Sequence, residues 1–134
     1  MDLHDGAAEV RRAIDFSPIA GTWINFDRQT RGTLRVIVTG GNDGLQVHIF
    51  GACSPEPCDW GAVPASAFAE SVSADRAVGF RAFYDFGFLE TMVAAYLNQR
   101  LLVVDTYNQF RDGSGRSPYF LRDHFYQEDT PSST

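Results

Sequence analysis

The stretch Ile19-Ala20-Gly21-Thr22-Trp23, with the alternating segments that follow it, decides the fold that we predict for this chain. A glycine and then a tryptophan open a succession of short runs that continues to about Gln127, with no helical pattern between them. Turn sequences such as Gly40-Gly41-Asn42-Asp43-Gly44 separate the runs. This succession predicts an all-β fold: an antiparallel sheet of about eight strands that closes on itself as an up-and-down barrel, with Trp23 at one end.

Alternation and turn residues set the expected bounds of the strands. These are residues 21–27, 33–39, 45–52, 61–72, 77–84, 88–96, 100–110 and 119–127. The only good helix candidate precedes them and ends at Ser17-Pro18, because proline disfavours a helical residue before it. We therefore predict a single domain over residues 1–134, with a short helix at 6–16, the β-barrel at 19–127 and a polar tail at 128–134. A β-sandwich is the structural alternative that the strand lengths leave open.

The charge of the chain excludes two classes of partner. A hydrophobic content of 44% is enough for a core, and the formal net charge is -6. Nucleic-acid binding needs a basic stripe, and docking on anionic lipid needs positive charge as well. We therefore expect neither a nucleic acid nor a membrane as partner. All eleven basic residues are arginine, so chemistry that needs a lysine amine is excluded.

The first residues also bear on location. Met1-Asp2-Leu3-His4-Asp5 is polar and acidic, without the basic and apolar regions of a signal peptide. No apolar run approaches the ~18 residues that a membrane helix needs. We expect a soluble, cytoplasmic protein. The arginine-only usage, together with abundant Ala and Gly, is typical of a bacterial source.

The run Asp15-Phe16-Ser17-Pro18-Ile19-Ala20-Gly21-Thr22-Trp23 resembles the opening motif of the calycin superfamily, which contains lipocalins, intracellular fatty-acid-binding proteins and avidins. The resemblance implies that Trp23 lies at the barrel base and that an arginine of the last strand, here Arg122, packs over it. A guanidinium over an indole face gains a cation–π contact. The resemblance also implies a cavity for a small hydrophobic or amphipathic molecule.

Several strands have one apolar face and one mixed aromatic–polar face, because side chains alternate across a strand. In one assignment the apolar faces fill the barrel and the mixed faces meet water. In the other the mixed faces line a wet cavity and the apolar faces pack in a dimer. The expected contact between Trp23 and Arg122 favours the second assignment. We therefore expect a homodimer.

The mixed faces supply the candidate site residues. For ligand binding these are Trp23, Asn25, His48, Phe50, Arg81, Phe83, Arg122 and Tyr126. Tyr107 and His124 fall on adjacent strands and are candidates for a catalytic acid–base pair. Three functions follow: a small-molecule binder, a cofactor-independent cyclase, isomerase or dehydratase of secondary metabolism, and a packed interaction domain. None of the three requires a cofactor.

The pair Cys53 and Cys58 leaves several chemistries open. With His48 and Asp59 nearby, a zinc site is conceivable, but the Cys-x4-Cys spacing is not that of structural zinc sites, and we predict no metal. A cytoplasmic location favours free thiols or a conditional disulfide, and a stable disulfide is the alternative. The segment between them can be a lid over the barrel mouth or a plain connector.

Overall fold

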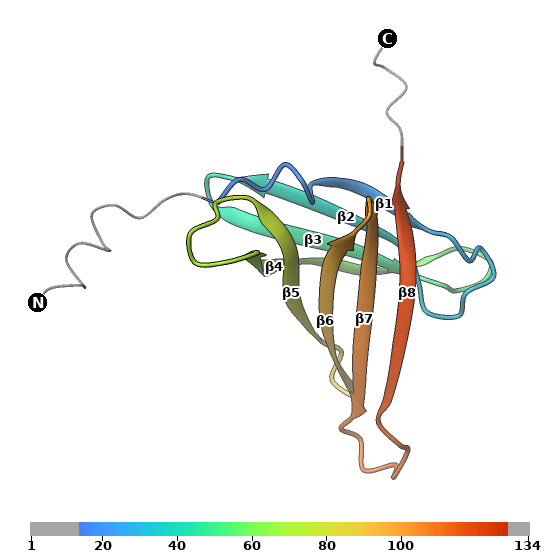
Figure 1. Cartoon of the computed structure of the whole chain (residues 1–134). Helices are drawn as coiled ribbons and strands as arrows, with labels where there is room; N and C mark the ends of the chain where they lie inside the picture. The colour runs from blue at the N-terminus through green and yellow to red at the C-terminus, as the bar shows by residue number, and fades with distance from the viewer. Residues whose placement is uncertain (1–13, 129–134) are drawn as a thin grey trace, which may run out of the picture.

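The computed structural model describes residues 14–128, which form a closed barrel of eight antiparallel strands in chain order (Figure 1). The strands are β1 (Gly21–Asn25), β2 (Thr33–Gly41), β3 (Gly44–Gly51), β4 (Cys58–Ala69), β5 (Ala77–Asp85), β6 (Leu89–Asn98), β7 (Leu101–Phe110) and β8 (Tyr119–Gln127). The predicted all-β, eight-stranded barrel is confirmed. It is compatible with the calycin-like fold that the motif around Trp23 resembles.

The segment before β1 closes one end of the barrel. The backbone of Asp15 bridges to Arg76, and Phe16 lies so close to Gly40 that any Cβ there would overlap its ring. The predicted helix at 6–16 falls almost entirely outside the described residues, and residues 14–16 are not helical. The polar tail at 128–134 also lies outside them, except for Glu128.

No helix within residues 14–128 is long and apolar enough to cross a membrane.

The barrel is strongly twisted, as Figure 1 shows: β2, β3 and β4 run across the upper part, and β5–β8 run steeply past them. The pairing between β1 and β8, which closes the barrel, is short. It consists of Trp23–Gln127, Ile24–Tyr126 and Asn25–Phe125. The first part of β8 pairs only with β7, from Asn108–Tyr119 to Val104–Asp123. The lower half of β5–β8 therefore extends beyond the closed part of the barrel, and its outer face is broad.

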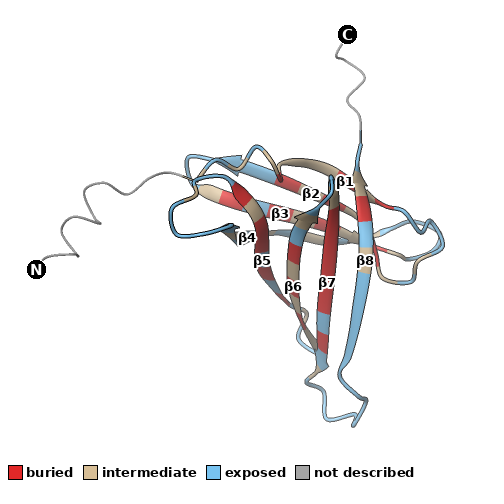
Figure 2. Ribbon diagram, viewed as in Figure 1, coloured by how far each residue is buried: buried red, intermediate tan, exposed pale blue. Residues whose placement is uncertain are grey.

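The interior is filled by the apolar faces of the strands. Buried side chains come from seven strands, and burial is strongest along β7 in Figure 2. They include Trp23, Val36, Val47, Ile49, Phe80, Val93, Val104 and Phe125. The assignment in which the apolar faces fill the barrel therefore holds. The assignment that we favoured, with the mixed faces lining the interior, is wrong. Burying apolar area contributes roughly 25 cal/mol per Å², so the wholly apolar faces turn inward.

Candidate ligand site at the open end of the barrel

The two ends of the barrel interior differ in chemistry. At the closed end Trp23 is 2% exposed, and its indole N–H donates to the carbonyl oxygen of Ile19 at 3.0 Å. At the other end the inner faces turn polar, with Thr33, Thr91, Thr106 and Asn108 all buried. These four side chains come from three strands, so the barrel itself brings them together.

The strand register explains how these buried polar side chains come together. On β7 the inward residues change from Val104 to Thr106 and Asn108 as the strand nears its end. On β6 the inward Thr91 lies directly opposite Asn108, and its hydroxyl donates to the Asn108 side-chain oxygen at 2.7 Å. A buried hydroxyl and amide thus satisfy each other, which makes their burial tolerable.

One polar atom of this set is left without a partner. Thr33 is 2% exposed, and its side-chain oxygen makes no hydrogen bond within residues 14–128. The Thr33 carbonyl oxygen, by contrast, accepts a hydrogen bond from the Asn25 side chain at 2.8 Å. An unsatisfied buried hydroxyl costs about 1–3 kcal/mol.

A cavity of about 120 Å³ at this end of the barrel is lined by Thr33 among other residues. Its lining combines the four buried polar side chains with apolar and loop residues. The further lining residues include Arg31, Gly51, Cys53, Trp60, Leu89, Tyr119 and Leu121. The volume is well above the ~10–15 Å³ that one water needs and well below the ~300 Å³ at which drug-sized pockets begin.

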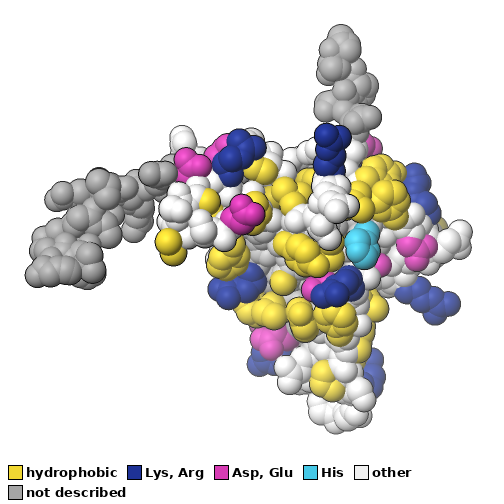
Figure 3. Space-filling model, in the orientation of Figure 1, with side chains coloured by type: hydrophobic (Ala, Val, Ile, Leu, Met, Phe, Trp, Pro, Cys, Tyr) yellow, Lys and Arg dark blue, Asp and Glu magenta, His cyan; other side chains and the backbone are white. Residues whose placement is uncertain are grey.

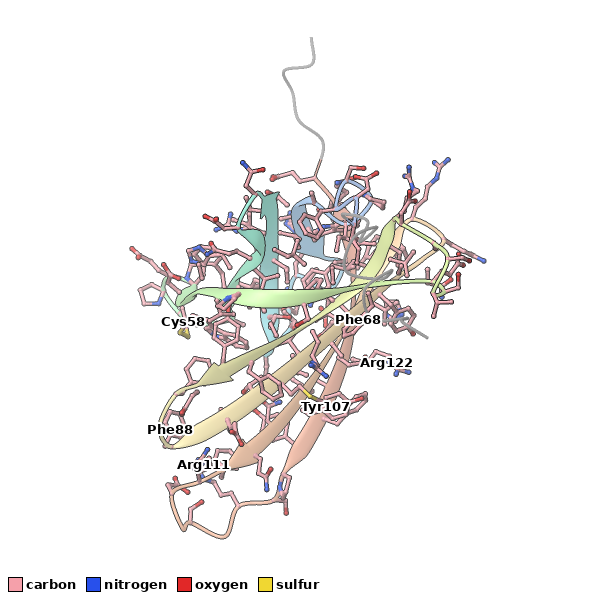
Figure 4. The ribbon with its side chains drawn as sticks, turned by 90° about the vertical axis from the view of Figure 1, so that its left-hand side faces the viewer. Cys58, Phe68, Phe88, Tyr107, Arg111 and Arg122 are labelled. Atoms are coloured by element: carbon pink, nitrogen blue, oxygen red, sulfur yellow. A yellow bond between two sulfur atoms is a disulfide. The ribbon has the colours of Figure 1, made fainter. Side chains whose placement is uncertain are left out.

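The loop over this end is held in place from both sides. Cys53 and Cys58 form a disulfide, so of the alternatives left open by the sequence the disulfide is present (Figure 4 labels Cys58). Outside the barrel, His48 Nε2 lies 2.5 Å from a carboxylate oxygen of Asp59. This contact, with the Gly61 backbone N–H, lowers the pKa of Asp59. Within residues 14–128 no three His, Cys, Asp or Glu side chains gather as a metal site.

Trp60 covers the cavity from β4. The indole packs edge-on against Tyr84 and Phe86, with ring centroids 5.4 Å apart in both cases. The Tyr84 hydroxyl donates to the Gly61 carbonyl oxygen at 2.7 Å, and burial raises the pKa of Tyr84 to about 12. A Cβ on Gly51 would lie 2.6 Å from Trp60 Nε1, so only glycine at 51 leaves room for the indole.

Of the ten residues proposed from the sequence, the structure places Trp23 and Asn25 inside the barrel. The other eight lie on strand faces that point outward. They are His48, Phe50, Arg81, Phe83, Tyr107, Arg122, His124 and Tyr126. Figure 4 shows two of them, Tyr107 and Arg122, on β7 and β8.

The expected contact of Arg122 with Trp23 is not formed. Trp23 lies opposite Gln127, an odd number of residues from Arg122, so the two side chains leave β8 on opposite faces. Arg122 instead donates to both oxygens of Asp105, the residue directly across on β7, at 2.8 and 3.0 Å. A carboxylate in register is a stronger partner for a guanidinium than a distant indole.

Tyr107 and His124 share the outer face but are not neighbours. Tyr107 lies opposite Phe120, and His124 lies opposite Val103. Four residues of strand, about 13 Å, separate the two positions, with the Asp105–Arg122 pair between them. The structure therefore does not bring the two candidate catalytic groups together.

The remaining outward candidates form local contacts on other parts of the surface. The rings of His48 and Phe50 stack at 4.6 Å, and the Arg35 guanidinium lies 4.6 Å from the Phe50 ring. Tyr126 packs against Phe26 with ring centroids 5.0 Å apart. None of these groups reaches the cavity.

Comparison of the chain with protein families, with curated proteins and with solved structures finds no match. The fold and the site define a small β-barrel with a packed closed half and a polar cavity at its open end. Thr33, Thr91, Thr106 and Asn108, which carry this cavity, were not among the predicted site residues. The signal that could have found them is the change from Val to Thr and Asn along the inner faces of β6 and β7.

Proposed function

We propose that the protein binds a small amphipathic molecule inside the open end of the barrel. The observation that carries the proposal is the cavity of about 120 Å³ lined by four buried polar side chains, of which Thr33 has a hydroxyl oxygen without a hydrogen-bond partner within residues 14–128. A ligand group that hydrogen-bonds this oxygen would remove the cost of its burial.

The lining narrows the class of ligand. Threonine hydroxyls and the Asn108 amide can donate and accept, so they suit a neutral group such as an alcohol, amide or carbonyl. Trp60, Leu89 and Leu121 supply apolar contact on the same cavity. A long hydrophobic chain does not fit, because Trp23, Phe80 and Phe125 fill the closed half of the barrel.

The two other functions, an acid–base enzyme and a packed interaction domain, gain less support from the structure. Acid–base catalysis by Tyr107 and His124 lacks a shared site, since the two residues lie apart on the outer face. A packed interaction domain does not account for a cavity lined by four buried polar side chains. A stable Cys53–Cys58 disulfide is more typical of an oxidising compartment than of the cytoplasm that we expected.

The first experiment is native mass spectrometry of freshly purified protein before and after denaturation. We expect a small non-covalent adduct that denaturation releases. Thr33→Val keeps the volume but removes the hydroxyl, so it should lose the adduct. Thr39→Val, an exposed position on β2, is the matched control and should keep it.

If the protein carries no adduct, two-dimensional NMR with a library of small neutral alcohols and amides tests the same site. Shifts confined to the amides around Thr33, Thr91 and Asn108 support the proposal. A cavity that holds only water, with no probe shifting these amides at millimolar concentration, would overturn it.

A further inference from the structure

The outer face of β5–β8 has a central row of large apolar side chains. Phe83, Met92, Tyr107 and Phe120 lie in register across the four strands, one from each. Phe83 is 54% exposed, Tyr107 43% and Phe120 46%. We call these four residues the aromatic row. Figure 3 shows hydrophobic side chains gathered over this part of the molecule.

The two sides of the aromatic row carry opposite charge. Along β5, Arg81, Phe83 and Asp85 point outward in turn, and both charged residues are exposed. On the Arg81 side the neighbouring positions are Ala94, Asp105 and Arg122, with Asp105 neutralised by Arg122. On the Asp85 side they are Glu90 and Gln109. Because Glu90 pairs with Arg111 at 3.1 Å, the charges left at the two edges of the row are Arg81 on one side and Asp85 on the other.

The surface around the aromatic row is not flat. An open groove of about 440 Å³ runs beside it, lined by Phe83, Glu90, Met92, Tyr107, Gln109 and Phe120 among others. Phe83 is the most exposed of the three rings. The face thus has one projecting ring, Phe83, with a hollow beside it.

The exposed apolar area of this face is about half of what a standard interface buries on each partner. Aromatic side chains carry about 150–250 Å² each, so three half-exposed rings with Met92 and Tyr96 expose roughly 400 Å². This is comparable to the largest patch of a typical monomer, about 300–600 Å², and about half of the ~800 Å² that a standard interface buries per partner. The polar edges of the row can supply the remainder.

We propose that this face binds a second copy of the chain, with a two-fold axis running along the aromatic row. Such an axis lays one row on the other and turns the basic edge of one copy onto the acidic edge of the second. Arg81 then faces Asp85 of the second copy, and this pair occurs twice. The two sheets stack about 10 Å apart, the usual distance for packed sheets.

Other occupants fit the charges less well. A hydrocarbon ligand would make no use of the charges of Arg81 and Asp85, and a nucleic acid would meet a chain of net charge -6. A second copy matches both signs by symmetry. The proposal does not depend on the cavity at the open end, which faces the interior.

Sedimentation velocity from about 1 to 200 µM tests the proposal. The natural chain should pass from monomer to dimer over this range. Phe83→Asp should weaken dimerisation at least tenfold, whereas Val72→Asp, at a fully exposed turn position, should leave it unchanged. A chain that is monomeric throughout, or a dimer that Phe83→Asp does not weaken, overturns the proposal.

A charge swap tests the two-fold arrangement itself. Arg81→Asp places two acids against each other and should weaken the dimer, as should Asp85→Arg by the opposite sign. The double variant restores the pair with reversed polarity and should recover most of the affinity. Asp85 also accepts the Gly87 N–H at 2.9 Å, so thermal unfolding must show that each variant remains folded. Folded variants whose double swap fails to recover dimerisation contradict the arrangement.

Discussion

Arg122 donates two hydrogen bonds to Asp105, at 2.8 and 3.0 Å, across the outer face of β7 and β8. The Asp105 side chain is 8% exposed and the Arg122 side chain 51% exposed, so the arginine acts as a cover over a buried carboxylate. A bidentate guanidinium–carboxylate pair is among the stronger polar contacts in proteins. The pair therefore ties β8 to β7 where β8 has no second neighbour.

Removing the Arg122 side chain should destabilise the barrel. Arg122→Ala leaves the Asp105 carboxylate buried without its partner, and we expect a loss of about 1.5–3 kcal/mol in the free energy of unfolding. Arg111→Ala is the control, because Arg111 is equally exposed and pairs with the half-exposed Glu90. It should cost less than about 1 kcal/mol. Urea unfolding of both variants measures the difference, and equal losses would show that burial of Asp105 does not matter.

Tyr84 should make the barrel sensitive to alkali. Burial raises its pKa from 10 to about 12, so the folded state keeps the proton that the unfolded state releases. The stabilisation is complete below pH 10 and is lost as the pH rises toward 12, by roughly 2–3 kcal/mol. Tyr84→Phe should flatten this dependence between pH 9.5 and 11.5 in urea unfolding. A variant with the same slope as the natural chain would assign the alkaline sensitivity to other groups.

Gly51→Ala should displace the indole that covers the cavity. The added methyl would lie 2.6 Å from Trp60 Nε1, whereas a methyl on Gly41 meets nothing within 4 Å. We expect Gly51→Ala to cost about 1–3 kcal/mol and to leave one tryptophan open to acrylamide quenching. Gly41→Ala should show the fluorescence of the natural chain. Unchanged quenching in Gly51→Ala would mean that the loop yields instead of Trp60.

The Cys53–Cys58 disulfide should be detectable by thiol titration. Protein purified without reductant is expected to react with Ellman's reagent only after reduction and unfolding. The bridge closes a short loop, with a sequence separation of 5, so changing both cysteines to serine should cost about 2 kcal/mol. Amide hydrogen exchange at 52–57 should rise in the same variant. Two titratable thiols in the native protein would contradict the bond.

The sequence was sufficient for the number and order of the strands, although the fourth, expected at 61–72, is Cys58–Ala69. It was insufficient for deciding which strand faces point inward. Period-two alternation correctly groups Leu102, Val104, Thr106 and Asn108 on one side of β7, but alternation alone does not say which side is inside. The assumed contact between Arg122 and Trp23 selected the wrong side. Free energy of apolar burial decides the matter in the structure, because the opposite choice would expose Val36, Val47 and Val93.

After the inward faces, the pairing register between strands is the second feature that the sequence does not determine. The pairing of Asp105 with Arg122, and of Thr91 with Asn108, depends on which residues meet across strands. Hairpin turns fix register only where they are short. The loop between β7 and β8 spans residues 111–118, so the separation of Tyr107 from His124 was not readable in advance.

The short pairing of β1 with β8 has a consequence for storage and handling. From Tyr119 to Asp123, β8 offers one side of its backbone to solvent, which is a place where a foreign strand can add. Asp123 lies on this edge, and its negative charge opposes such growth. Burial raises the pKa of Asp123, so this carboxyl is neutralised at a less acidic pH than an ordinary aspartate. Acidification therefore removes this charge from the open part of β8, and we expect the addition of a foreign strand there to increase as the pH falls.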